Sequence, residues 1–423
     1  MVIVGVVGAG TMGAGIAQVA LEAGERVVMH DPDDEAVARA AVRIRDGLER
    51  RRRSVDRRPT DGPTSDVDEA MGRLGAAPDI DALAMASDVV IEAAPEDLSV
   101  KRAIFARLGT AAGPSTILAT NTSALSVEAV AAAATRPGRV IGLHFFNPAP
   151  LMALVEVATT VMSDPAVVER AMRLMAAWGK TPVRTADSPG FIVNRVNRPF
   201  TLEALRMLEL GLGSVEGIDA AVRAAGFPMG PFQLMDLVGI DVNLASARGI
   251  FETFHYEPRF RPSVIQERLV EAGRLGRKTG EGFYWYGEDG RSLGMAGAFV
   301  EDSGVLQASA ARARPLLVDG EPALGRPAAG IATTVLGDPL VERIVLAVIN
   351  EAYRAVGDGV ATAPDVDLAM RLGASHPRGP FEQVERAGGS LAVLDRLERI
   401  AARGDEVEGR FDPAPLLIET AAR

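Results

Sequence analysis

Two side chains near the middle of the chain could form an acid–base pair. His144 ends an apolar run, 140–143, that is typical of a short buried strand, and Asn147 with Pro148 ends that strand. A second apolar run, 154–157, contains one carboxylate, Glu156. An imidazole titrates near neutral pH, and a buried carboxylate on the next strand would fix its tautomer, so the pair could act as a general base and its orienting partner. A core histidine beside an edge glutamate is the structural alternative.

A glycine-rich turn near the N-terminus could bind a dinucleotide. The run 2–7 predicts a strand buried on both faces, and it leads through Gly8-Ala-Gly-Thr-Met-Gly13 into a helix that ends near Gly24. The first glycine permits a tight turn, the second lets the backbone approach a pyrophosphate, and the third lets helix and strand pack closely. A glycine turn without a nucleotide is the alternative. The candidate cofactor contacts are Gly8, Gly10, Thr11, Met12 and Gly13.

Asp31 indicates which dinucleotide would bind. It ends the next predicted strand, 26–30, about 20 residues after the glycine turn, where a carboxylate can accept a hydrogen bond from a ribose 2′-hydroxyl. Because a carboxylate repels the 2′-phosphate of NADP, Asp31 favours NAD.

Further polar residues follow the strands predicted at 88–92 and 116–119. Ligands bind beyond the carboxyl ends of strands in open parallel sheets, so Asn121 and Ser123 are candidates for substrate or nicotinamide contacts. Both residues could instead cap a helix, since Ser126 and Glu128 resemble a helix start signal.

Composition restricts the possible classes of protein. The length of 423 residues suggests two or three domains, and the net charge of −11 argues against a general nucleic-acid binder. With no cysteine, disulfides, thiolate catalysis and cysteine-ligated metals are excluded, and we expect no metal site. We see no apolar run long enough to span a membrane and no secretory signal, so we expect a cytoplasmic enzyme.

Arginines gather late in the helix predicted from 33 to 53. They could attract a polyanionic substrate tail such as the phosphates of coenzyme A, or simply form a solvated helix face. The segment 57–68 that follows is predicted to be a loop. The arginines are Arg43, Arg45, Arg50, Arg51, Arg52, Arg53, Arg57 and Arg58.

The alternation of strands and helices ends near Asp187, and a long helix is predicted from 191 to 210 with further helices to about 275. We predict domains at 1–187 and 188–287, a linker at 288–335, and a last domain at 336–423. This last domain repeats the second, because 195–219 aligns with 343–367 at a constant offset of 148. Asn194 corresponds to Glu342, so we interpret the second copy as structural.

Taken together, these residues resemble the L-3-hydroxyacyl-CoA dehydrogenase family. The similarity covers 2–286 almost continuously, and 338–395 resembles a second copy of the family's C-terminal domain. It implies an α/β Rossmann-type N-terminal domain followed by two all-α C-terminal-type domains. The motifs that carry it are Gly8–Ala17, Asn121–Ser123, His144–Pro148, Leu154–Val157, Pro189–Arg195 and Gly230–Phe232.

The resemblance implies a role for each site residue. His144 would be the catalytic base and Glu156 its partner, while Ser123 and Asn194 would hydrogen-bond the substrate oxygen. The resemblance also implies that Asn147 supports the site. Asp31 would hold the adenosine ribose, and the nicotinamide and substrate region would be lined by Glu96 and Lys101, with Asn121 nearby.

The implied reaction is NAD-dependent oxidation of an L-3-hydroxyacyl-CoA to the 3-ketoacyl-CoA. Longer members of the family act on 3-hydroxybutyryl-CoA or 3-hydroxyadipyl-CoA, in fatty-acid or aromatic-acid catabolism. The helical domains would pair within the chain, with a homodimer also open. A dehydrogenase of a free hydroxy acid, such as a gulonate dehydrogenase, and a non-catalytic nucleotide-binding protein are the alternatives.

Overall fold

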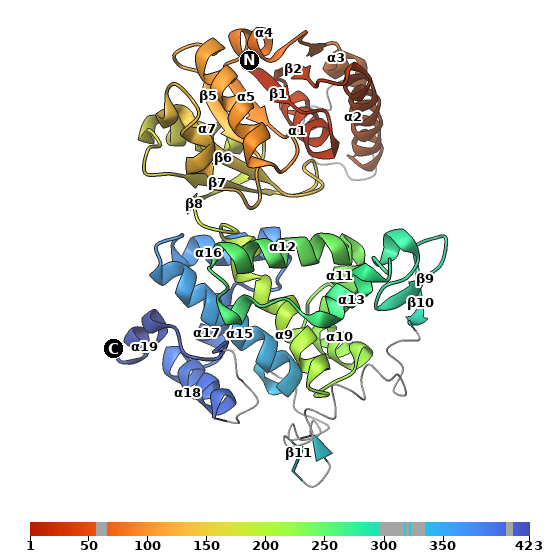
Figure 1. The fold of residues 1–423 in the computed structure, drawn as a ribbon, viewed down its shortest axis with the longest axis vertical. Helices are drawn as coiled ribbons and strands as arrows, with labels where there is room; N and C mark the ends of the chain where they lie inside the picture. Colours follow the sequence, from red (N-terminus) through yellow and green to blue (C-terminus); the bar gives the residue numbers. More distant parts are fainter. Residues whose placement is uncertain (56–65, 297–316, 319–320, 323–334, 403–408) are drawn as a thin grey trace. The chain divides into compact units, whose positions relative to one another are not determined.

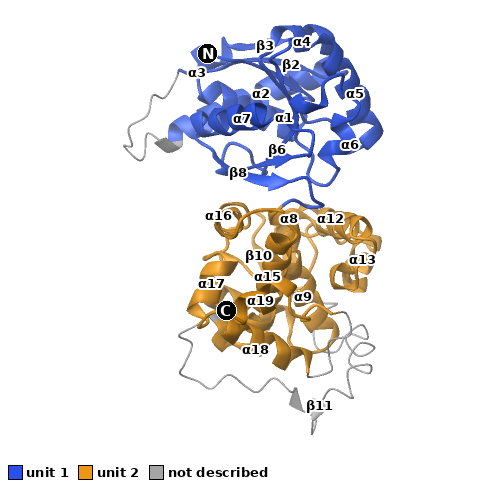
Figure 2. Cartoon of the chain, turned by 90° about the vertical axis from the view of Figure 1, so that its left-hand side faces the viewer, with its two compact units in different colours: residues 1–191 blue, residues 192–423 orange. Residues whose placement is uncertain are grey.

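The computed structural model describes residues 1–55, 66–296, 317–318, 321–322, 335–402 and 409–423. They form two compact units, residues 1–191 and 192–423 (Figure 2). The boundary lies close to the one predicted near Asp187, and both helical copies belong to the second unit. Arg57, Arg58, most of the predicted loop 57–68 and most of the predicted linker 288–335 lie outside the described residues.

The first unit is built on an eight-stranded sheet with the order β3-β2-β1-β4-β5-β6-β7-β8 (Figure 1). Neighbouring strands run parallel except β6 and β7, which are antiparallel. The strand order reverses at β1, where doubly wound sheets bind dinucleotides. The strands are β1 (Ile3–Val7), β2 (Arg26–His30), β3 (Leu74–Ala76), β4 (Val89–Glu92), β5 (Ile117–Thr120), β6 (Val140–Phe145), β7 (Leu154–Thr159) and β8 (Thr181–Ala186).

Helices cover both faces of this sheet. One face packs against α1, α2, α3 and α7, and the other against α4, α5 and α6. Alternate residues of one strand therefore enter different cores: Val89 and Ile91 pack in the first, and Val90 packs in the second. This confirms the predicted Rossmann-type fold and explains its continuous apolar runs. The helices are α1 (Thr11–Glu22), α2 (Asp34–Val55), α3 (Val67–Met71), α4 (Ile80–Ala86), α5 (Leu98–Ala111), α6 (Val127–Ala131), the 3₁₀ turn η1 (Pro137–Arg139) and α7 (Pro165–Ala177).

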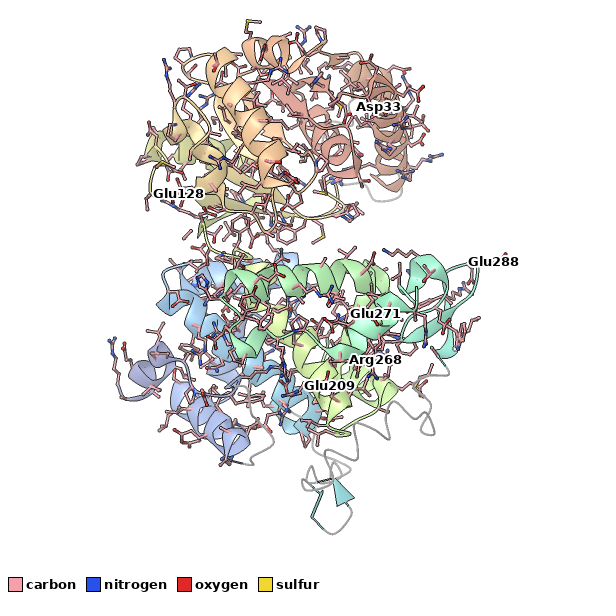
Figure 3. The ribbon with its side chains drawn as sticks, in the orientation of Figure 1. Asp33, Glu128, Glu209, Arg268, Glu271 and Glu288 are labelled. Carbon is pink, nitrogen blue, oxygen red and sulfur yellow. The ribbon has the colours of Figure 1, made fainter. Side chains whose placement is uncertain are left out.

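The second unit is mostly helical. Glu209, which is labelled in Figure 3, lies at the end of α9. It accepts a hydrogen bond at 2.5 Å from the hydroxyl of Ser263, which caps α13. Its elements are α8 (Val193–Val196), α9 (Arg198–Glu209), α10 (Val215–Ala224), α11 (Pro231–Val238), α12 (Ile240–Thr253), η2 (Pro258–Phe260), α13 (Val264–Glu271), η3 (Arg277–Thr279), β9 (Tyr284–Tyr286), β10 (Ser292–Met295), β11 (Leu317–Val318), β12 (Glu321–Pro322), η6 (Val335–Gly337), α15 (Pro339–Gly357), α16 (Ala363–Gly373), α17 (Pro380–Arg386), α18 (Ser390–Ala401) and α19 (Pro415–Ala421).

The two helical copies match element by element. Helices α8 and α9 correspond to α15, α10 to α16, α11 to α17 and α12 to α18. Asp219 accepts two backbone N–H bonds from the first turn of α11, at 3.0 and 3.1 Å. Its counterpart Asp367 accepts two from the first turn of α17, at 2.7 and 3.0 Å. The repeat found in the sequence is therefore a repeat of structure.

The long helix predicted from 191 to 210 is wrong, because the structure divides it. Helix α8 begins at Val193, Asn197 follows it, and α9 begins at Arg198. Pro199 has no N–H to donate, and its ring would clash with the carbonyl one turn earlier, so the helix is interrupted there. The second copy has Ala347 at this position, and α15 continues through it without a break.

Buried ion pairs also join the two copies. Helix α9 packs on α15, and Arg195 of the first copy binds Glu351 of the second at 2.7 Å. The equivalent Arg343 of the second copy binds the equivalent Glu203 of the first. None of these four side chains is more than 2% exposed. Because each pair is the image of the other, the copies pack through the same surface, as the subunits of an isologous dimer do.

His376 lies at this contact. Its Nε2 is hydrogen-bonded with Asn197 Oδ1 at 2.8 Å, and its ring lies 5.6 Å from that of Phe200 and 5.0 Å from that of Phe227, centroid to centroid. Burial lowers the pKa of His376 to about 3. The ring is therefore neutral at physiological pH and joins the second copy to the first.

Glu351 faces a second arginine, Arg259, at 2.9 Å. We expect Glu351→Gln to lower the free energy of unfolding of the second unit by about 3 kcal/mol, because buried guanidinium groups lose their carboxylate. Urea unfolding followed by far-UV circular dichroism measures this. Glu382→Gln, which breaks a surface pair with Arg371, should cost less than about 1 kcal/mol. Equal effects of the two variants would contradict the assignment.

His376 also predicts a dependence of stability on pH. An unfolded histidine titrates near 6.5 and the folded one near 3, so the unfolded chain binds more protons between these values. The contribution of neutral His376 to the free energy of unfolding should be fully present above about pH 6.5. It should fall by about 2 kcal/mol on going to about pH 5. His376→Gln should reduce this slope, and the exposed His255→Asn should keep it. An unchanged slope in His376→Gln would show that His376 does not cause it.

Candidate active site

His144 and Glu156 are paired across two strands. They are direct partners in the antiparallel ladder between β6 and β7, so both side chains lie on one face of the sheet. The His144 Nδ1–H donates to Glu156 Oε2 at 2.7 Å. His144 is 7% exposed and Glu156 is fully buried. With Nδ1 donating to the carboxylate, Nε2 has the lone pair that can accept a proton, which is the arrangement of a general base.

Aromatic rings and an amide hold this pair in place. The rings of Phe146 and Phe191 lie 4.5 and 5.8 Å from the imidazole, centroid to centroid. Asn121 Oδ1 accepts a hydrogen bond from the backbone N–H of Phe145 at 2.8 Å. Asn121 therefore joins the end of β5 to the residue after His144, and its side-chain oxygen does not cap a helix. Ser126 is the residue that caps α6.

A buried ion pair organises the loops after β4 and β5. Glu92 accepts hydrogen bonds at 2.7 Å from Lys101 Nζ and from Thr120 Oγ1. Both charged side chains are at most 1% exposed. Lys101, which the resemblance places at the nicotinamide and substrate region, has its ammonium group bound to Glu92 in the structure. In the sequence, only its place at the end of an apolar run indicates that Glu92 has a structural role.

Glu96 joins the same two loops. Its Oε1 accepts bonds from Thr122 Oγ1 at 2.6 Å and from the backbone N–H of Ser123 at 2.9 Å, and Lys101 Nζ lies 3.4 Å from its Oε2. Burial raises the pKa of Glu96, but the hydrogen bond from Thr122 and the charge of Lys101 reverse this, so the pKa is lowered overall. Glu96 is thus a fixed carboxylate beside Ser123, which is itself partly exposed.

The glycine turn has the shape that a pyrophosphate requires. Gly8 has a φ of +100°, and a Cβ on Gly13 would lie 1.9 Å from the carbonyl oxygen of Gly8. A Cβ on Gly10 would meet no atom within 4 Å among the described residues. The N-terminus of α1 follows directly and has no side-chain cap among the described residues, so its N–H groups can bind an anion. Of the other candidates in the turn, Thr11 is exposed and Met12 is partly exposed.

Asp31 lies beside this turn. Its Oδ2 accepts a hydrogen bond from the backbone N–H of Ala9 at 2.8 Å, and its Oδ1 accepts one from Asp33 at 3.0 Å. The side chain is partly exposed, so it can also accept from a ribose hydroxyl. A dinucleotide therefore fits the residues of this turn.

Basic side chains contact the loops on either side of the turn. Arg43 donates to the carbonyl of Ala9 at 2.6 Å, and Arg51 donates to that of Pro150 at 3.2 Å. Lys180 Nζ donates to the carbonyl oxygens of Ala149 and Met152, at 2.6 and 2.8 Å, and fastens the loop that follows His144. Sequence reasoning missed Lys180, because nothing near it in the chain indicates this contact. Arg50, Arg52 and Arg53 are exposed.

Asn147 and Asn194 are the two remaining candidates. Asn147 is exposed in the loop after β6. Asn194 is partly exposed on α8 and belongs to the second unit. No helix of the described part of the chain has the length and apolarity to cross a membrane.

Comparison with known proteins gives a consistent result. The family model of the 3-hydroxyacyl-CoA dehydrogenase NAD binding domain matches residues 3–188. The model of the 3-hydroxyacyl-CoA dehydrogenase C-terminal domain matches residues 190–286 and 340–421, which correspond to the two helical copies.

Individual proteins agree with the family models. The chain is 40% identical to the 3-hydroxyadipyl-CoA dehydrogenase of Escherichia coli, over 99% of this chain and 97% of that protein. It is 42% identical to a 3-hydroxybutyryl-CoA dehydrogenase of Mycobacterium tuberculosis, over 67% of this chain and 98% of that protein. The crystal structure of an Escherichia coli 3-hydroxybutyryl-CoA dehydrogenase superposes with a TM-score of 0.82 and 37% identity, covering 100% of this chain and 98% of that one.

The open space at Gly10 predicts how two glycine variants differ. Gly10→Ala should fold with unchanged thermal stability but bind NADH about 10-fold more weakly or worse, because the methyl group occupies the path of the pyrophosphate. Gly13→Ala should lower stability as well, since its Cβ meets a backbone oxygen. Thermal melts and NADH fluorescence titrations measure both effects. Unchanged NADH affinity in Gly10→Ala would mean that the dinucleotide binds elsewhere.

Proposed function

Because the chain belongs to the 3-hydroxyacyl-CoA dehydrogenase family and is an NAD-dependent oxidoreductase, we propose that it oxidises an L-3-hydroxyacyl-CoA to the 3-ketoacyl-CoA. The observation that supports this most directly is the buried His144–Glu156 pair. His144 is the second-last residue of β6, at the same edge of the sheet as the glycine turn and Asp31.

In the proposed chemistry the protein accepts one proton from the substrate. Bound NAD supplies the hydride acceptor. His144 Nε2 accepts the proton of the 3-hydroxyl as the C3–H bond breaks and the carbonyl forms. Glu156 holds the imidazole in the required tautomer and offsets the positive charge that develops on it. The loop that carries Asn147 and Pro148 is fastened by Lys180, which keeps the residues after His144 in place.

Other residues are proposed to orient the reactants. Ser123, which is held by Glu96, and Asn194 are proposed to hydrogen-bond the substrate oxygen. Glu96 is proposed to border the nicotinamide. We assign Lys101 a positioning role through Glu92 and Glu96, because its ammonium group is buried between carboxylates. Asn121 is proposed to act in the same way through Phe145, and Asn147 by shaping the loop.

The arginines of α2 are proposed to attract the phosphates of coenzyme A. Arg50, Arg52 and Arg53 are exposed on the same helix from which Arg43 and Arg51 reach the loops of the site. Exposed guanidinium groups bind phosphate well, since the planar fork can donate two parallel hydrogen bonds.

The acyl chain is proposed to be short or to end in a carboxylate. A relative aligned over nearly the whole chain is named 3-hydroxyadipyl-CoA dehydrogenase, and a solved structure of the same extent is named 3-hydroxybutyryl-CoA dehydrogenase. Roles in fatty-acid or aromatic-acid catabolism are both compatible with these names. The reciprocal ion pairs between the helical copies support a pseudo-dimer within one chain.

A rate assay tests this function. We expect acetoacetyl-CoA to drive NADH oxidation and free acetoacetate to be at least about 100-fold poorer, because the thioester arm supplies binding energy. His144→Ala should lower kcat about 1000-fold and Glu156→Gln about 100-fold, since the first removes the base and the second leaves an imidazole without its counter-charge.

His255→Asn, a histidine substitution on the exposed surface, is the matched control and should keep full activity. Equal rates with free acetoacetate would favour the free hydroxy acid alternative. Full activity in His144→Ala would overturn the proposed base.

A further inference from the structure

Arg198, the first residue of α9, is a buried cation without an acidic partner in the described part of the chain. The side chain is 6% exposed, and the one side-chain group it binds among the described residues is the hydroxyl of Ser246, at 2.7 Å from its Nη2. Its Nε is buried, and no described residue accepts a hydrogen bond from it. Burial lowers the pKa of Arg198 to about 10, so the group is still charged at neutral pH. Buried charges in proteins are normally paired, and Arg198 differs in this from the other buried arginines in the described part of the second unit.

Other buried arginines of the same unit are paired in the usual way. Arg195 binds two carboxylates, those of Glu351 and Asp358, at 2.7 and 2.6 Å. Arg343 and Arg410 both bind Glu203. The described residues of the unit therefore supply carboxylates where a guanidinium group serves folding, and they supply none that pairs with Arg198.

The second helical copy shows that folding does not require a charge at this position. The residue equivalent to Arg198 is Leu346, which is fully buried in α15. A leucine satisfies the packing of this helix in one copy, so the arginine of the first copy serves another purpose.

The position of Arg198 indicates what that purpose is. Asn194, proposed to contact the substrate oxygen, lies four residues earlier, and Asn197 between them keeps helical dihedral angles. Because the backbone stays helical across the break between α8 and α9, the two residues lie about one turn apart, with Cβ atoms about 6 Å apart. Ser246, which accepts the hydrogen bond from Arg198, is partly exposed, so the guanidinium lies next to accessible surface.

We propose that Arg198 binds the terminal carboxylate of the acyl chain, so that the substrate class is a dicarboxylyl-CoA with a 3-hydroxyl group. This inference rests on the proposed function and specifies its substrate. In a 3-hydroxyadipyl chain the far carboxylate lies three carbon–carbon bonds from C3, a span comparable to the four-residue separation of Asn194 on α8 and Arg198 at the start of α9. The phosphates of coenzyme A lie at the other end of the substrate, beyond the thioester. A planar guanidinium also matches a carboxylate through two parallel hydrogen bonds.

The test compares two substrates in the full-length enzyme with NAD: 3-hydroxyadipyl-CoA and 3-hydroxybutyryl-CoA. We expect Arg198→Leu, which installs the residue of the second copy, to lower the ratio of their kcat/KM values by about 100-fold, through KM for the dicarboxylyl ester. The loss should appear in KM because the carboxylate does not change during the reaction. Arg198→Lys, which keeps the charge but not the fork, should lower the ratio less.

Arg371→Leu is the matched control, because it removes an exposed arginine of α16 and should leave the ratio unchanged. The melting temperature of Arg198→Leu should equal or exceed that of the parent, since an unpaired buried charge is replaced by an apolar residue. If Arg198→Leu does not fold, Arg198→Met provides the same comparison.

The outcomes separate the inference from the proposed function. If the parent enzyme oxidises neither ester, the proposed function fails. If it oxidises both and Arg198→Leu lowers their kcat/KM values equally, Arg198 is structural and the inference is overturned. A parent enzyme that does not prefer the dicarboxylyl ester also overturns the inference and leaves the proposed function intact.

Discussion

The hydrogen bond between His144 and Glu156 depends on one departure from the parallel sheet, the antiparallel pairing of β6 with β7. Residues directly opposite in such a pair carry their side chains on the same face. A slip of one residue would turn Glu156 to the other face and leave the imidazole without its carboxylate. Val155 and Val157, the neighbours of Glu156, are fully buried in the core and hold the register. The acid–base pair is therefore positioned by hydrophobic packing on the opposite face.

Features that depend on neighbouring residues could be predicted from the sequence, whereas contacts between distant residues could not. The turn from Gly8 to Gly13 was predicted because its signal is local, and the repeat was predicted because two segments of the sequence match at a constant offset. The short elements β3, α3 and α4 were not predicted, since each has too few residues to show a period. The break before Pro199 was missed because proline is tolerated in the first turn of a helix. Asn121 and Lys180 act on backbone groups 24 to 31 residues away, and no spacing rule predicts such contacts.

Buried ion pairs serve different purposes in the two units. In the first unit, Lys101 and Glu92 fix the loops after β4 and β5, where small displacements would alter the geometry of the site. In the second unit, Arg195 with Glu351 and its image fix the register between two similar surfaces. A buried ion pair is weak evidence for stability, because desolvation offsets much of the attraction. Its stronger effect is to exclude arrangements that leave either charge unpaired, and both units need one arrangement.

The differences between the helical copies show which residues the packing of this domain does not require. Packing acts on both copies, and the arginines and glutamates of the contact between them are present in both. Asn194, Arg198 and Pro199 are replaced in the second copy by Glu342, Leu346 and Ala347, all at the start of one helix. Glu342 forms an ion pair with Arg396 inside its own copy, so that position has become structural. In the first copy the three residues lie where α8 meets α9, and two of them, Asn194 and Arg198, are the residues proposed to contact the substrate.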